Sequence, residues 1–160
     1  MKRFLIIVLL LSLLSGCAHV VSREMRDRSD QVTPLGEIFG DPARHEGRIV
    51  ILGGIIMSAW NTDEGTYVEV LQKPLDYRGR PTQTDSTLGR FLVLHRSYLD
   101  TAIYVTGREV TAAGEVIGRR ILPLGEIDYP YLLIEGREIH LHSLGTPFPI
   151  FFSIGVGVGF

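Results

Sequence analysis

Arg48-Ile-Val-Ile-Leu-Gly-Gly-Ile-Ile-Met57 is the stretch that indicates the fold, because it is a continuous apolar run rich in β-branched residues. Such a run is typical of a strand that is buried on both faces. Gly53-Gly54 in its middle would permit a bulge or a sharp bend, which a small closed barrel requires. The 18 glycines of the chain separate several such runs, and this composition favours an all-β domain with tight turns.

Four more segments have the character of strands, so the sequence predicts five strands in all. The turn at residues 61–65 joins the first strand to the second as a hairpin, in which Thr66, Val68 and Val70 share one face. The four segments are 66–71, Arg90–His95, Arg108–Ala113 and Leu132–His142. Residues 73–87 and the Gly- and Pro-punctuated residues 114–130 are expected to be loops.

Two short helices are expected beside these strands. Asp41-Pro42 has the residue types of a helix start, and Gly47 is suited to end that helix. Leu99 and Ile103 have the spacing of one helical face, which predicts a second helix between the third and fourth strands. Five strands with a helix at this place have the order of an OB-fold, so the expected fold class is an all-β, OB-fold-like five-stranded barrel.

The only cysteine, Cys17, follows directly after Leu14-Ser15-Gly16. Upstream lie a basic start and an apolar run that is too short for a bilayer, which takes about 20 apolar residues. Leu-Ser-Gly-Cys resembles the lipobox of bacterial lipoproteins. The resemblance implies that residues 1–16 are a cleaved signal peptide and that Cys17 carries N-acyl and S-diacylglyceryl groups. A free thiol, an intermolecular disulfide and an uncleaved apolar anchor are the alternatives.

Loss of residues 1–16 would leave 144 residues, enough for one domain. Residues 17–33 are mostly polar and are expected to be a flexible tether, with a short helix as the alternative. Residues 34–142 would form the barrel. The uncharged residues 143–160 would be a tail that packs on itself, is disordered, adds as an edge strand or contacts a membrane or a partner.

Charge and sorting signals bear on partners and location. Removing Lys2 and Arg3 changes the formal net charge from −2 to −4, which argues against electrostatic capture of nucleic acid. Ala18 follows the cysteine where an aspartate would retain a lipoprotein in the inner membrane. The sorting rule of Gram-negative lipoproteins therefore implies the outer membrane, with the domain facing the periplasm.

Several short motifs, in their order and spacing, carry a resemblance to a known family. They are Cys17 in its lipobox, Gly47, Gly53-Gly54, Glu69–Asp76, Gly89–Leu92, Tyr98-Leu99-Asp100, Ile103-Tyr104, Val110-Thr111, Gly114, Gly118 and Tyr129-Pro130. With these motifs the chain resembles the Slp family of starvation-inducible outer-membrane lipoproteins, from the lipobox to about His142. The resemblance implies a periplasmic domain of the envelope stress response with no established enzymatic activity or cofactor.

Glu138, His140 and His142 are the weak candidates for a metal site, because alternate residues of a strand point to the same side. Imidazole and carboxylate are zinc ligands. However, Ile139 and Leu141 give the strand an apolar opposite face, and a strand that buries this face leaves the histidines in solvent. The expectation is therefore that no metal is bound.

Tyr77, Arg78, Arg80 and Arg90 in and after the long loop are the candidate ligand-binding residues. Arginines and aromatic side chains on the face of an OB-fold bind oligonucleotides or sugars. In the periplasm a glycan, a peptide or an anionic lipid headgroup would be the ligand class. The alternative is that these arginines only solvate a polar loop. Asp76 is expected to close a turn in this loop.

The sequence thus predicts a non-enzymatic outer-membrane lipoprotein with a role in envelope maintenance or interaction under starvation or stress. No cofactor is expected besides the covalent lipid, and the expected partners are the outer membrane and an envelope protein or glycan. The first alternative is a carrier or binding module for an envelope glycan, peptide or lipid headgroup. The second alternative is a metal-dependent hydrolase.

Overall fold

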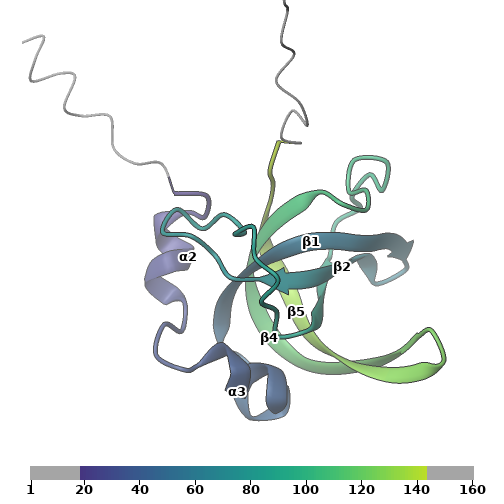
Figure 1. The fold of residues 1–160 in the computed structure, drawn as a ribbon, viewed down its shortest axis with the longest axis horizontal. Coiled ribbons are helices and arrows are strands. Elements are labelled where there is room, and N and C mark those ends of the chain that lie inside the picture. Colours follow the sequence, from purple (N-terminus) through teal and green to yellow (C-terminus); the bar gives the residue numbers. More distant parts are fainter. Residues whose placement is uncertain (1–18, 144–160) are drawn as a thin grey trace, which may run out of the picture.

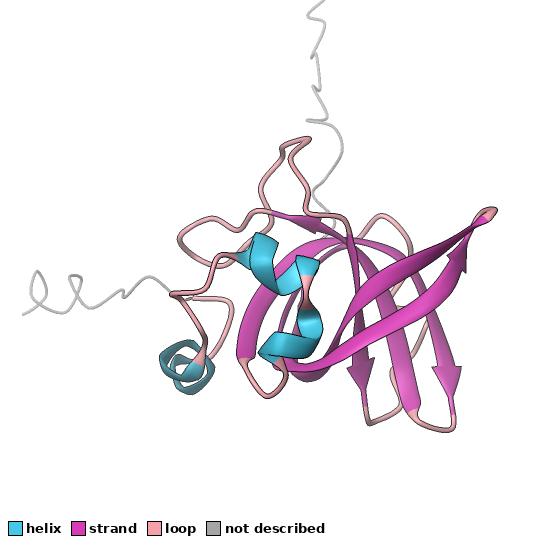
Figure 2. Ribbon diagram, turned by 90° about the horizontal axis from the view of Figure 1, so that it is seen from below, coloured by secondary structure: helices cyan, strands magenta, loops and turns pink. Residues whose placement is uncertain are grey.

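Five strands close into a barrel in the computed structural model, which describes residues 19–143 (Figures 1 and 2). The elements in chain order are α2 (Arg23–Arg28), α3 (Leu35–Gly40), the 3-10 helix η1 (Pro42–His45), β1 (Ile49–Thr62), β2 (Gly65–Lys73), β3 (Arg90–His95), β4 (Glu109–Leu124) and β5 (Ile127–Leu141). The strand order around the barrel is β1-β2-β3-β5-β4, and only β3 and β5 run parallel. This is the order of an OB-fold, so the predicted fold class is confirmed.

Alternate residues of β1 point into the barrel, where Val50, Leu52 and Ile56 are buried. Gly54 continues this inward series, and a Cβ atom placed on it would lie 1.9 Å from the carbonyl oxygen of Leu71 on β2. The predicted bulge is not at these glycines, because the register with β2 shifts only after Ile56. The glycine instead permits two backbones to approach closely.

The core is a ring of aliphatic side chains from all five strands around Phe91. One end of the barrel is covered by α3, whose Ile38 is fully buried in the core and whose Phe39 meets the Phe91 ring edge to face at 6.3 Å (Figure 1). The sequence did not predict α3, which lies directly before the expected helix. The expected helix itself is the single 3-10 turn η1, followed by Gly47 with a φ of +83°.

The helix predicted over residues 97–104 is wrong, since these residues form turns. Asp100 closes the turn, because its carboxylate accepts from the amide of Ala102 at 2.9 Å and its carbonyl accepts from the amide of Ile103 at 2.9 Å. A side chain that bonds its own backbone competes with helix formation. Leu99 and Tyr104 nevertheless pack against the core, as their apolar spacing suggested.

The predicted loop over residues 114–130 is also wrong, because β4 and β5 continue through it as one long hairpin. Gly125, with a φ of +63°, makes the tight turn between the strands. Pro123 and Pro130 lie in the distal part of the hairpin, which projects beyond the barrel as a two-stranded ribbon (Figure 2). Proline is tolerated on the free edge of a strand, because the N–H that it lacks would face away from the neighbouring strand and is not needed for pairing.

The described part of the expected tether is packed on the barrel, so the flexible alternative is wrong for residues 19–33, and the alternative of a short helix is found in α2. Val21 is 3% exposed, α2 begins two residues later, and Ser29 pairs with Ile49 of β1. The amide of Asp30 donates to the carbonyl of Ile49 at 2.8 Å. Hydrophobic burial and backbone pairing therefore fix this segment. Cys17, the expected signal peptide and residues 144–160 lie outside the described residues. Among residues 19–143 no helix is long and apolar enough to cross a membrane.

Candidate functional site

A cavity of about 560 Å³ lies between the N-terminal segment and the β2–β3 loop, residues 74–89. Its walls combine apolar side chains, such as Val21 and Leu75, with polar groups from both segments. The buried Nε atom of Arg26, which lines the cavity, has no hydrogen-bond partner within residues 19–143. A second cavity of about 500 Å³ adjoins it and shares Leu35, Ile51 and Leu75.

Asp30 holds one wall of this cavity in place. Its carboxylate accepts from the amides of Val32 and Thr33, both at 3.0 Å, and from the Arg48 guanidinium. The bonds from Thr33, followed by the one from Arg48, lower the pKa of Asp30 well below its usual range. The carboxylate therefore stays ionised and keeps the segment after α2 against β1.

The β2–β3 loop is folded around Asp76, as the sequence suggested. Its carboxylate accepts from the amides of Arg78 at 2.9 Å and Arg80 at 2.8 Å, which lowers the pKa of Asp76. Gly79 takes a φ of +87° in this turn. Tyr77 is 72% exposed at the tip, and the guanidinium carbon of Arg78 lies 5.2 Å from its ring centroid. The structure thus brings three of the four candidate ligand-binding residues together.

Arg90, the fourth candidate, belongs to a different cluster on β3. Its guanidinium donates to Glu69 of β2 at 2.6 Å, and Glu69 also accepts from Ser58 at 2.7 Å and from the hydroxyl of Tyr131 at 3.0 Å. Burial raises the pKa of Glu69, but these three hydrogen bonds outweigh burial and lower it. Burial, followed by the bond to Glu69, raises the pKa of Tyr131 to about 12. This cluster joins β1, β2, β3 and β5 and has a structural role.

The outer face of β2 and β3, where OB-folds bind their ligands, is covered by the protein's own side chains. A second apolar cluster buries Tyr67, Leu92, Leu94, Tyr131 and Leu133 there, and side chains of the β4–β5 hairpin pack over it. The rim is closed by Trp60, which stacks on Tyr67 at 5.6 Å, and by Arg120, whose guanidinium lies 4.7 Å from the same ring. This face is therefore filled rather than open.

The three metal candidates do not form a site. Among residues 19–143 no group of three or more His, Cys, Asp or Glu side chains is placed to hold a metal ion. Glu138 accepts from the amide of Ser22 at 3.0 Å and lies 3.1 Å from Nε2 of His140, and its pKa is lowered by these contacts despite the opposing effect of burial. His142 is only 7% exposed, contrary to the expectation of a solvated histidine, because the β2–β3 loop covers it.

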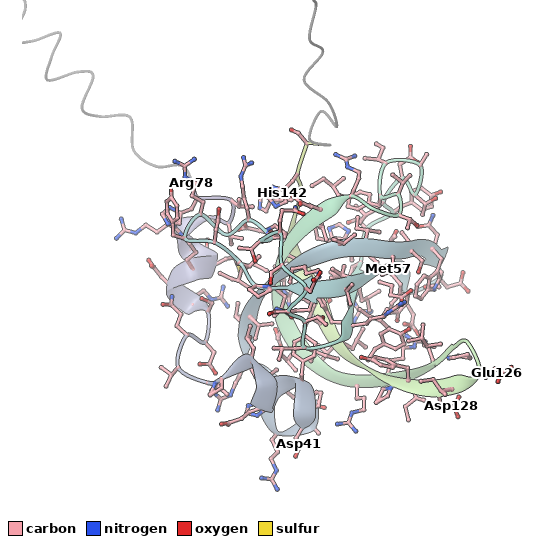
Figure 3. The ribbon with its side chains drawn as sticks, in the orientation of Figure 1. Asp41, Met57, Arg78, Glu126, Asp128 and His142 are labelled. Atoms are coloured by element: carbon pink, nitrogen blue, oxygen red, sulfur yellow. The ribbon has the colours of Figure 1, made fainter. Side chains whose placement is uncertain are left out.

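His142 connects the end of β5 to that loop through Thr111. The Thr111 hydroxyl donates its only hydrogen to the carbonyl of Gly79 at 2.7 Å, so His142 Nε2, 2.8 Å away, is the donor to Thr111. Figure 3 shows His142 and Arg78 on the same edge of the molecule. Burial, followed by the nearby charge of Arg80, lowers the pKa of His142 below its usual value of 6.5.

We expect the domain to lose stability as the pH falls below 6.5, because the unfolded chain then binds a proton that the folded imidazole resists. The His142→Gln variant keeps an N–H donor but cannot titrate, so its loss should be smaller. Urea unfolding midpoints at pH of about 7.5 and about 5.5 provide the comparison. An equal loss in both proteins would contradict this role of His142.

Sequence reasoning missed the Glu69 cluster and the Asp30–Arg48 pair. A signal was present for the first of them, because Glu69 interrupts the apolar residues Val68 and Val70 within a strand. A charged residue in such a place requires a partner when it is buried. The partner of Asp30 is 18 positions away, and no local pattern predicts it.

A lipobox-like stretch at residues 14–17, followed after the short helices α2, α3 and η1 by a closed barrel of OB order, is the arrangement of a lipoprotein with a single β-barrel domain. The family model described as "Outer membrane lipoprotein Slp family" matches residues 14–144. The chain belongs to this family, and it is an outer-membrane lipoprotein.

Comparison with individual proteins adds a structural likeness to the fold. No curated protein matches the chain by sequence. The crystal structure of the small single-stranded DNA-binding protein from Streptomyces coelicolor is similar to 60% of this chain and 93% of its own length, with 15% sequence identity and a TM-score of 0.39.

Proposed function

We propose that the protein is held in the outer membrane by acyl chains on Cys17, with its barrel in the periplasm, and that it serves envelope maintenance under starvation or stress through non-enzymatic interactions. The observation that carries the proposal is the family match, which includes Cys17 and the whole described domain. Two or more acyl chains give stable anchoring, whereas one chain binds only marginally.

The contacts of the polar side chains support a non-enzymatic role. Arg90 is engaged by Glu69, His140 by Glu138, and His142 by Thr111. The first and third pairs join different strands or strand ends of the barrel, and the second pair lies within β5. The residue types that would supply acid, base or metal chemistry thus stabilise the fold.

The Cys17→Ser variant tests the anchor. We expect it to lose labelling by radioactive palmitate and to accumulate as the unprocessed precursor, because the hydroxyl is not a substrate for diacylglyceryl transfer. Membrane fractionation and electrophoretic mobility provide the measurement. An Ala18→Ser variant leaves the cysteine in place and should be processed normally. Normal processing of Cys17→Ser would contradict the lipid anchor.

A small binding module is the second candidate, and the 560 Å³ cavity favours it. The cavity has the size of sites for small molecules, and its lining combines apolar side chains with Arg26 and Arg78. An anionic headgroup or glycan would complement these guanidinium groups. Native mass spectrometry of the domain exported through a cleavable signal without the lipid, and taken gently from the periplasm, would reveal such a ligand as excess mass that is lost on denaturation.

A further inference from the structure

The described chain is fixed to the barrel from its first residues onward. The amide of Val20 donates to the carbonyl of Arg78 at 2.9 Å, Val21 is buried, and the amide of Ser22 donates to Glu138 at 3.0 Å. Three successive residues thus contact the β2–β3 loop, the barrel and β5. The segment after Val20 therefore does not act as a flexible linker between an anchor and the domain.

Cys17 lies three positions before Val20. Three residues span at most about 10 Å, whatever their conformation, because a fully extended chain advances about 3.3–3.6 Å per residue. A lipid on Cys17 is consequently attached to a residue whose Cα atom lies within about 10 Å of that of Val20, so the membrane surface lies close to the bond between Val20 and Arg78. The flexible tether over residues 17–33 that the sequence suggested would have given no such limit.

The loop that lies at this place has the chemistry of a membrane interface. Tyr77, Arg78 and Arg80 are exposed at its tip, with the Arg78 guanidinium close to the Tyr77 ring. Tyrosine is enriched at the headgroup level of membranes, and arginine forms charge-assisted bonds to phosphate. The carboxylate of Asp76 is turned into the loop, where it accepts two backbone amides.

The two ends of the described chain lie on one side of the molecule, and an acidic hairpin tip lies on the other (Figure 3). Arg78 lies on the edge where the described chain begins, and His142, next to its end at Ser143, lies on the same edge (Figure 3). Glu126 and Asp128, at the tip of the β4–β5 hairpin, lie on the opposite side of the molecule (Figure 3). A negative tip is suited to point away from anionic lipids.

We propose that the loop tip formed by Tyr77, Arg78 and Arg80 docks on the phospholipid headgroups of the leaflet that holds the anchor, so that the barrel has one fixed orientation on its membrane. This inference rests on the proposed lipidation of Cys17. Tyr77 lies in the headgroup layer, and the two arginines contact lipid phosphates. The β4–β5 hairpin points into the periplasm.

Fluorescence quenching on the acylated, full-length protein tests this orientation. Tyr77→Cys and Glu126→Cys are each labelled with a fluorophore, which reacts at one position only because the thiol of Cys17 carries lipid. The protein is placed in vesicles of phosphatidylethanolamine and phosphatidylglycerol at a ratio of about 3:1, a composition with anionic headgroups. A nitroxide on the lipid headgroups should quench the probe at position 77 several-fold more than the probe at position 126.

A charge reversal tests the headgroup contact. Arg78→Glu with Arg80→Glu should lower quenching at position 77 at least several-fold. Arg44→Glu with Arg119→Glu makes the same charge change at the α3 end and should leave quenching unchanged, since Arg44 pairs with Asp41 and Arg119 contacts Gly40 there (Figure 3). Trp60 fluorescence verifies that each variant is folded.

The possible outcomes distinguish the fixed orientation of the barrel from the lipid anchor on Cys17. Equal quenching at positions 77 and 126 in protein that floats with the vesicles would overturn the fixed orientation and leave the lipid anchor intact. Unchanged quenching after reversal of Arg78 and Arg80 would overturn the headgroup contact. Protein that lacks the acyl mass and does not float would overturn both the anchor and the inference.

Discussion

Replacing Gly54 with alanine is expected to destabilise the barrel by about 3 kcal/mol or more, the upper end of overpacking effects. The added methyl group would lie 1.9 Å from the carbonyl oxygen of Leu71 and 2.8 Å from its carbonyl carbon. Both atoms belong to the backbone of β2, so no side-chain rotation relieves the contact. The strands must separate where β1 pairs with both β2 and β4.

Urea unfolding of the mature domain, followed by the fluorescence of Trp60, measures this loss. Gly36→Ala is the matched control, because a Cβ there has no atom within 4 Å and the residue lies in α3. Alanine in a helix is more stable than glycine by about 0.5–1 kcal/mol, so the control should gain stability. A Gly54→Ala protein as stable as the wild type would contradict the close approach of β1 and β2.

The second large effect is expected for Glu69→Ala, which removes the common acceptor of Arg90, Ser58 and Tyr131. Breaking a buried ion pair from one side costs about 3–5 kcal/mol, because the remaining charge loses its partner. The hydroxyl of Tyr131 also becomes an unsatisfied buried donor. Glu69→Gln keeps one acceptor oxygen and should lose less.

The same urea experiment tests this prediction. Glu24→Ala is the control, since Glu24 makes an exposed pair with Arg28 on α2. Pairs of this kind contribute little, so its unfolding midpoint should stay close to that of the wild type. If Glu69→Ala and Glu24→Ala unfolded at the same urea concentration, the central role of Glu69 would be refuted.

The first three strands were predictable from the sequence because each contains a run or an alternation of apolar and β-branched residues. Their positions agree with the structure, although β1 and β2 are longer than expected. The predicted strands were shorter than β4 and β5, because Gly114 and Gly118 are residues typical of turns. The same is true of Pro123 and Pro130. In the structure these glycines occur where the register between β4 and β5 shifts, and Gly118 has a φ of +117°. Local composition does not distinguish a bulge from a loop.

The candidate site was predictable only in part. Tyr77, Arg78 and Arg80 are close in sequence and share one turn, so their proximity followed from Asp76. The separation of Arg90 depends on its contact with Glu69, 21 positions earlier, and the burial of His142 depends on a loop from another part of the chain. Such contacts depend on packing between segments that are distant in the chain. Local patterns in a single sequence do not predict this packing.

The pairing of the N-terminal segment with β1 and the β2–β3 loop has a mechanical consequence. A force on the proposed anchor would not be absorbed by a flexible linker, because it would reach the bond from Val20 to Arg78 first and then the bond from Asp30 to Ile49. Tension between the membrane and a partner bound to the barrel would first detach α2 and so open the cavity beside it. A force between the membrane and the barrel would therefore act on the folded domain itself.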